Sequence, residues 1–166
     1  VGAIEALLEK GNADVNKADN NGWTPLHFAA HTDHVGAIEA LLEKGNADVN
    51  KANKYGWTPL HFAAQNGHAV AIKALLEKDA DVVNQANEHG CTPLHIAVEN
   101  SHVEAIKALL EKDADVKKAD EDGLTPLHIA VENGNVEAIK ALLEKGADVD
   151  QADIYNDGAT PLLIAV

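Results

Sequence analysis

The sequence contains no arginine and no methionine, only one cysteine, and few aromatic residues. All 13 basic residues are lysines, set against 27 acidic residues, so the net charge is −14. A nucleic-acid-binding protein needs a basic surface that neutralises phosphates, so we do not expect nucleic acid as a partner. The acid is unevenly spread, because residues 1–83 carry a net charge of −4 and residues 84–166 carry −10. We interpret this excess either as a solubility feature or as a preference for a basic partner surface.

The single cysteine, Cys91, has no partner for an intrachain disulfide, so we expect an intracellular, reducing setting such as the cytoplasm. No apolar run approaches the length of a membrane span, and Val1 to Lys10 form an amphipathic stretch unlike a secretion signal. We therefore expect no membrane partner. Since no methionine is present to initiate translation, we interpret the chain as a segment of a longer protein. With aromatic residues at 4%, the core must be built from Ala, Leu, Ile and Val.

One short segment recurs through the chain. The sequence TPLHFAA at residues 24–30 returns with small changes at 58–64, 92–98, 125–131 and 160–166, at intervals of 34, 34, 33 and 35 residues. A second segment of the type AI-x-ALLEK opens the chain and comes after every copy of the first segment except the last. Recurrence at a period of this length indicates a stack of repeated units.

Each unit is predicted to contain two helices. In the first helix, Thr is the N-cap and Pro takes the first helical position, where no N–H is required. The second helix is the AI-x-ALLEK segment, whose apolar residues have helical spacing and should face the neighbouring unit. We expect a left-handed residue at the end of each second helix. The residues in that place are Gly11, Gly45, Asp79, Asp113 and Gly146.

The units are predicted to be joined by an extended strand of the Ala-Asp-Val type and a polar turn closed by glycine, which together form a hairpin-like arm. Differences in length fall in these connections. Asn12, Asn46 and one residue of the Val82–Val83 pair are interpreted as single insertions, and residues 153–158 are two longer than residues 120–123. Surface loops accept such insertions, so we expect one continuous stack.

These features together resemble the ankyrin repeat, a unit of about 33 residues with an arm and two antiparallel helices. The resemblance covers the whole chain and implies an all-α repeat solenoid that forms a curved stack and a single domain over residues 1–166. Polar capping repeats, which usually close such stacks, are not recognisable, and the last motif has Leu163 in place of His. The expected units are a half-repeat at 1–20, complete repeats at 21–54, 55–88, 89–121 and 122–156, and a half-repeat at 157–166.

Histidine is abundant, and its spacing allows a metal interpretation. His27, His31 and His34 would lie on one helical face, as zinc ligands often do. Equivalents of His27 and His34 recur with the repeat, however, and the resemblance implies that the motif His is a scaffold residue bonded to the motif Thr and to nearby backbone. We therefore predict no metal site and no cofactor.

A catalytic interpretation centres on Cys91, because His89 and His95 are close in sequence and a Cys–His pair can act as a nucleophile and base. Cys91 falls in the variable position after the arm glycine, where its counterparts are not nucleophiles. We expect it to be an exposed free thiol, and we predict no enzymatic activity.

Positions that differ between repeats, while most of the repeat sequence stays constant, indicate the binding residues. Two sets of positions change from one unit to the next, the arm tips and the last turns of the first helices. The resemblance implies that they line one concave face that grips partner proteins. The candidate partner-binding residues are Asn20, Asn21, Trp23, His31, Thr32, Lys54, Tyr55, Trp57, Gln65, Asn66, Glu88, His89, Cys91, Glu99, Asn100, Glu121, Asp122, Leu124, Glu132, Asn133, Ile154 and Tyr155.

The expected function is that of a non-catalytic protein–protein interaction module. Its partner should carry a basic or a mixed apolar and basic surface, because the candidate face is aromatic in its N-terminal half and acidic in its C-terminal half. Trp23 and Trp57 are open to two interpretations, partner binding or packing against the neighbouring arm, while Tyr55 is expected to be exposed. The alternative function is a structural scaffold element that self-associates end to end through its uncapped half-repeats.

Overall fold

The computed structural model describes residues 1–154 and 157–166, so the candidate residue Tyr155 lies outside the described residues. The described residues form ten α-helices and one 3₁₀ helix. In chain order these are α1 (Gly2–Glu9), α2 (Pro25–His31), α3 (Val35–Glu43), α4 (Pro59–Gln65), α5 (Ala69–Lys78), η1 (Ala80–Asn84), α6 (Pro93–Glu99), α7 (Val103–Leu110), α8 (Pro126–Glu132), α9 (Val136–Glu144) and α10 (Pro161–Ile164).

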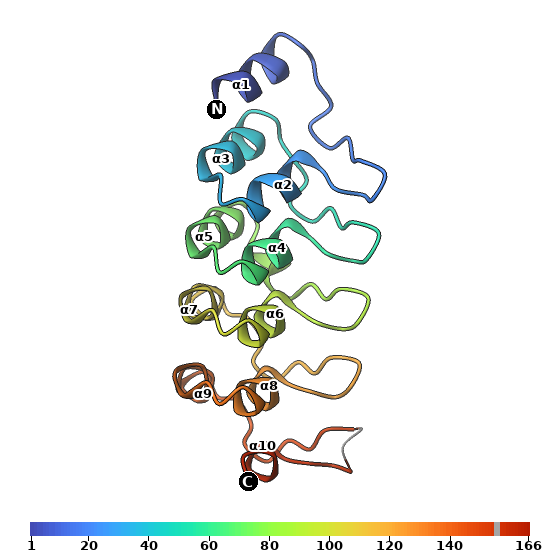
Figure 1. The fold of residues 1–166 in the computed structure, drawn as a ribbon. Coiled ribbons are helices and arrows are strands. Elements are labelled where there is room, and N and C mark those ends of the chain that lie inside the picture. Colours follow the sequence, from blue (N-terminus) through green and yellow to red (C-terminus); the bar gives the residue numbers. More distant parts are fainter. Residues whose placement is uncertain (155–156) are drawn as a thin grey trace.

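The helices stack in two columns (Figure 1). The helices that begin at a Thr-Pro motif, α2, α4, α6, α8 and α10, form one column, and α1, α3, α5, α7 and α9 form the other. Each helix contacts the next one in its own column, the arms project beyond the first column, and the two termini lie at opposite ends. The predicted all-α repeat solenoid is confirmed, whereas the repeat boundaries stay a prediction.

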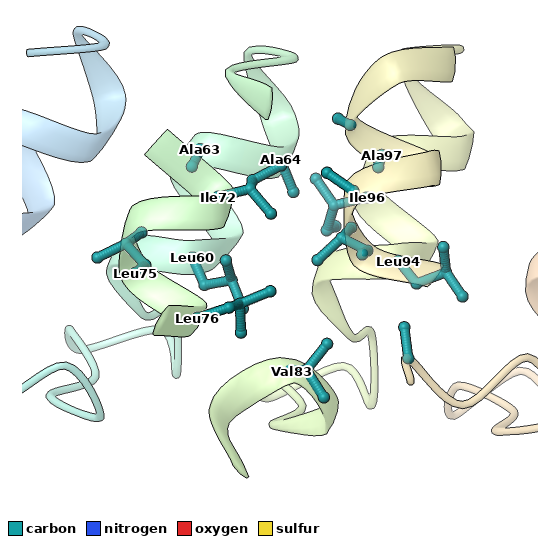
Figure 2. Close-up of a cluster of buried hydrophobic side chains, with 14 of the residues drawn as sticks. Leu60, Ala63, Ala64, Ile72, Leu75, Leu76, Val83, Leu94, Ile96 and Ala97 are labelled. Carbon is teal, nitrogen blue, oxygen red and sulfur yellow. The ribbon is translucent and has the colours of Figure 1, made fainter. Parts of the chain in front are cut away.

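Small aliphatic side chains fill the space between the columns, as the scarcity of aromatic residues predicted. Among the described residues, Phe62 is the one aromatic side chain that is buried in this core. Figure 2 shows buried side chains of α4, α5, α6 and η1 that meet between the helices. The labelled ones are Leu60, Ala63, Ala64, Ile72, Leu75, Leu76, Val83, Leu94, Ile96 and Ala97.

The motif His joins α2, α4 and α6 each to the next arm. In α4, the Nδ1 of His61 accepts the backbone N–H of Thr58 at 3.1 Å and lies 2.8 Å from the Thr58 hydroxyl. The acceptor role of Nδ1 leaves the proton on Nε2, which donates to the carbonyl oxygen of Cys91 at 3.1 Å. The same bonds recur at His27 and His95. The scaffold role expected for the motif His is confirmed.

The prediction of a strand after each second helix is wrong, because the described residues contain no strand. After α5 the chain forms η1, and Asp79 caps this 3₁₀ helix in an extended conformation (φ −151°) instead of the expected left-handed one. Val82 and Val83 are both buried. Consecutive side chains of an extended strand point to opposite faces, so a tight helical turn is needed to bury both. At Asp113 the left-handed conformation is present, with φ +58°.

The expected left-handed glycine is present at the end of α9, where Gly146 has a φ of +82°, but not at the ends of α1 and α3. There the inserted residues take this conformation, with φ +48° at Asn12 and +53° at Asn46. Gly11 and Gly45 are needed for space instead, because an added Cβ would lie 2.6 and 2.8 Å from the carbonyl oxygen four residues earlier. Asn tolerates the left-handed region better than most residues, which explains why both inserted residues are asparagines.

None of the described helices has the length and hydropathy of a membrane span, and the longest, α5, has 10 residues.

The buried motif histidines predict a loss of stability on mild acidification. Burial lowers the pKa of His61 to about 4, and burial also lowers the pKa of His27 and of His95. As the pH falls from 6.5 towards 4, the unfolded chain binds protons that the folded chain does not, so the free energy of unfolding decreases. Between about pH 7 and about pH 5.5, His61 alone is expected to cost about 1 kcal/mol.

Urea unfolding followed by circular dichroism at both pH values measures this change. In His61→Leu, which copies the residue found at Leu163, the pH effect should be smaller by about 1 kcal/mol. His89→Leu is the matched control, because the His89 side chain is 71% exposed. Equal pH effects in the wild type and in His61→Leu would contradict the prediction.

Candidate binding groove

A side-chain oxygen at the base of each of the first four arms holds the arm tip in place. In the second arm, Oδ1 of Asn53 accepts the N–H groups of Tyr55 at 2.9 Å and Trp57 at 3.0 Å. Gly56 closes this turn with a φ of +73°, and a Cβ there would lie 2.8 Å from the backbone nitrogen of Glu88. The first, third and fourth arms use the same pair of bonds, accepted by Asp19, Asn87 and Asp120.

Neighbouring arm tips are joined to each other by backbone hydrogen bonds. Each bond connects two candidate residues of successive units, so positions far apart in the sequence form one row. The pairs, donor first, are Lys54 and Asn21 at 3.2 Å, Glu88 and Tyr55 at 3.4 Å, and Glu121 and His89 at 3.1 Å.

A pocket of about 210 Å³, which we call the aromatic pocket, lies between the first two arms and the end of α4. The candidates Trp23, Tyr55, Trp57 and Gln65 line it together with Asn53 and Phe62. The ring centroid of Phe62 lies 4.2 Å from that of Trp23 and 5.1 Å from that of Trp57. Both indoles therefore pack against a core residue and also line the pocket, so the two interpretations of the tryptophans are compatible. Tyr55 is 54% exposed, as expected.

Sequence reasoning missed Phe62, although a signal was present. The residue after the motif His is Phe in the first two copies, Phe28 and Phe62, and Ile in the next two, Ile96 and Ile129. This position varies like the arm tips, but it lies inside a motif that was treated as constant.

A second pocket of about 460 Å³, which we call the acidic hollow, adjoins the aromatic pocket and shares Trp57 with it. Four of its lining side chains carry carboxylates, so the hollow concentrates negative potential beside the aromatic pocket. Besides Trp57, the hollow is lined by the candidates His89, Cys91, Glu99, Asp122, Leu124, Glu132 and Asn133, and by the unpredicted Asn87, His95, Ile96, Asp120 and Ile129.

The remaining described candidates lie outside both pockets. Some close the ends of first helices, since the Thr32 hydroxyl donates to the Phe28 carbonyl and the Asn100 amide to the Ile96 carbonyl, each at 2.8 Å. Two others link neighbouring units through their side chains, with 3.0 Å between the Asn66 amide nitrogen and Nδ1 of His31. The others are exposed at arm tips, namely Asn20, Asn21, Lys54, Glu88, Glu121 and Ile154.

Cys91 is half-buried, so the expectation of an exposed thiol is wrong. Its Sγ lies 3.9 Å from both the His89 carbonyl oxygen and the Asp120 carboxylate. Burial, followed by the charges of Asp120 and Glu99, raises the pKa of the thiol to about 11. The nitrogens of His95 bond to Thr92 and to the next arm, not to the thiol. Cys91 is therefore protonated at neutral pH.

The three histidines considered as metal ligands are engaged separately. Both ring nitrogens of the buried His27 are hydrogen-bonded, His31 is bonded to Asn66, and Nδ1 of His34 lies 3.2 Å from the Thr32 hydroxyl. No group of three or more His, Cys, Asp or Glu side chains in the described part of the chain could hold a metal ion.

The raised pKa of Cys91 predicts slow alkylation. A pKa of about 11 instead of 9 lowers the thiolate fraction about a hundredfold at neutral pH, and the greater nucleophilicity of the more basic thiolate offsets part of this loss. Iodoacetamide should therefore react with the folded protein at least about tenfold more slowly than with the urea-unfolded chain. Mass spectrometry of timed samples measures both rates.

A matched variant tests the contribution of the carboxylate to this effect. Asp120→Asn keeps the arm turn, since Asn53 and Asn87 hold the equivalent turns, and it removes one negative charge beside the thiol. Alkylation should therefore become faster, and an unchanged rate would show that burial alone suppresses the thiolate.

Comparison with known families agrees with the repeat pattern and the two-column stack. The family model described as "Ankyrin repeats (3 copies)" matches residues 1–86, 45–120, 79–153 and 116–166, which together span the chain. A search of curated proteins returned no match. Ankyrin repeats are generally protein–protein interaction modules. The chain belongs to the ankyrin-repeat family.

Proposed function

We propose that the chain is a non-catalytic module that binds a partner protein in the groove formed by the aromatic pocket and the acidic hollow. The observation that carries this proposal is the continuity of the two hollows, which share Trp57 and run along one row of hydrogen-bonded arm tips. A flat or interrupted surface would not offer one extended segment of a partner a continuous site.

The chemistry of the groove indicates the kind of partner. Its first half presents the exposed ring of Tyr55 and the indoles of Trp23 and Trp57, and such residues supply much of the binding free energy at many interfaces. Its second half holds the carboxylates of Glu99, Asp120, Asp122 and Glu132. A partner with an apolar patch beside a Lys- and Arg-rich segment would match both halves.

Charge reversal in the acidic hollow tests the proposal. The triple variant Glu99→Lys, Asp122→Lys, Glu132→Lys replaces three exposed acidic residues with lysines, which would repel a basic segment of the partner. Its matched control reverses three exposed acids on α3 and α5, with Glu39→Lys, Glu43→Lys and Glu77→Lys. Both variants change the net charge equally, so only the position of the change differs.

Affinity capture with the wild type and both variants should identify a protein that the wild type and the control retain and the groove variant loses. With that protein purified, the groove variant should bind at least about tenfold more weakly at low salt, and the difference should shrink as salt screens the charges. Tyr55→Ala should weaken binding by about tenfold as well. A partner that both triple variants lose equally, or that neither loses, would count against the groove.

End-to-end self-association is a second candidate function, favoured by apolar surface at both ends of the stack. At the C-terminal end, the exposed Leu143 and Leu162 line a hollow of about 550 Å³ between α8, α9 and α10, and Leu163 is exposed as well. At the other end, Leu7 of α1 is 60% exposed. Contact between unlike ends is heterologous and can propagate from one copy to the next.

Sedimentation velocity over a wide range of protein concentration distinguishes this candidate. If the ends associate, the mean mass should rise with concentration, and Leu162→Asp with Leu163→Asp should suppress the rise. Val70→Asp, at an exposed apolar position in the middle of the stack, should not. A strict monomer at every concentration would rule out self-association.

A further inference from the structure

The aromatic pocket is built from four rings that come from three different segments. Trp23 belongs to the first arm, Tyr55 and Trp57 to the second, and Phe62 to α4. Phe62 is buried and touches both indoles, so it forms the base, while the half-buried indoles stand beside it and the exposed Tyr55 lies at the rim. Asn53 and Gln65 complete the lining. We propose that this pocket binds a trimethylammonium group, carried as a trimethyllysine side chain by the partner.

The polar lining of the pocket favours a cation without N–H donors. No carboxylate is among its lining residues, and Oδ1 of Asn53 already accepts two backbone N–H groups. An unmodified lysine ammonium has three donors and is strongly hydrated, so it would enter without a charged acceptor. A trimethylammonium group has no N–H, and the faces of aromatic rings attract it.

Three imidazoles lie near the rings of the pocket, two of them buried, and the third, His31, exposed with its ring 5.6 Å from that of Trp23. The rings of His27 and His61 lie 6.1 Å from Trp23 and 5.6 Å from Trp57, and burial lowers the pKa of both, so they are neutral at neutral pH. Lys54 is exposed at the same arm tip and does not line the pocket. Across Trp57 lies the acidic hollow, whose negative potential attracts cations.

This inference rests on the proposed function, because it assigns one side chain of the partner to one part of the groove. The residues flanking the trimethyllysine would run into the acidic hollow. A synthetic peptide of Gly, Ser and Lys with a central trimethyllysine is therefore the simplest probe that contains both chemical features.

Three such peptides separate the alternatives. The first carries trimethyllysine, the second unmodified lysine, and the third the neutral analogue with a tert-butyl group in place of trimethylammonium. The two tryptophans of the chain both line the pocket, so a titration followed by tryptophan fluorescence reports binding directly. We expect the trimethyllysine peptide to bind at least about fivefold more tightly than either of the others.

Two variants test whether the preference for trimethyllysine arises in the aromatic pocket. Tyr55→Ala removes an exposed rim ring with little effect on the fold, and it should abolish the preference for trimethyllysine. Val70→Ala changes a similarly exposed side chain on α5, outside the groove, and should keep it. Loss of the preference in both variants would place the binding elsewhere.

Several outcomes would overturn the inference. Equal affinity for the tert-butyl analogue would show an apolar pocket, equal affinity for unmodified lysine would show simple charge attraction, and no binding of any peptide would show that the pocket is not a cation site. The proposed function would survive each of these if the captured partner still needed the acidic hollow. Conversely, a trimethyllysine preference would stand even if the charge-reversal variant bound its partner normally.

Discussion

A neutral imidazole between successive units is the interaction on which the groove depends. Nδ1 of the motif His must accept a hydrogen bond from the motif Thr while Nε2–H donates to the next arm, and only the neutral ring can do both. The carbonyl groups that receive these bonds belong to Trp57, Cys91 and Leu124. These same residues line the groove with their side chains. Since the scaffold uses only their backbone, their side chains are free to vary.

At the last interface the described residues do not make this bond, and no described residue beyond it lines either pocket. His128 keeps its bonds to Thr125, but its buried Nε2 has no partner in the described part of the chain, and a buried unpaired donor costs about 1–3 kcal/mol. The next arm, at residues 153–159, is two residues longer than the one before it. None of its described residues lines either pocket, and Ile154 is exposed. Among the described residues, the lining of the groove and the series of His bonds thus end at the same interface.

The sequence was sufficient to predict features set by local rules and by the period. The Thr-Pro helix starts result from capping chemistry, and the two-column stack results from the recurrence of two apolar segments. The failures arose where tertiary packing decides the outcome. Whether Val82 and Val83 form a strand depends on what buries them, and whether Cys91 is exposed depends on the neighbouring arm that carries Asp120. Phe62 was missed because its place at the base of the pocket depends on Trp23, which comes from the preceding arm and lies far away in the sequence.

Two positions of the repeat explain why the groove changes width along its length. The arm residue and the residue after the motif His are Trp and Phe in the first two complete repeats, then Cys and Ile, then Leu and Ile. Where both are rings they pack against each other at a tilt, as Trp57 and Phe62 do with 5.1 Å between ring centroids, and the remaining space is about 210 Å³. Where they are smaller, the space widens to about 460 Å³ and acidic side chains border it. These two contacting positions therefore set the size of the space, whereas the acidic character comes from other positions of the repeat, where Glu99 and Asp120 stand in place of Gln65 and Asn53.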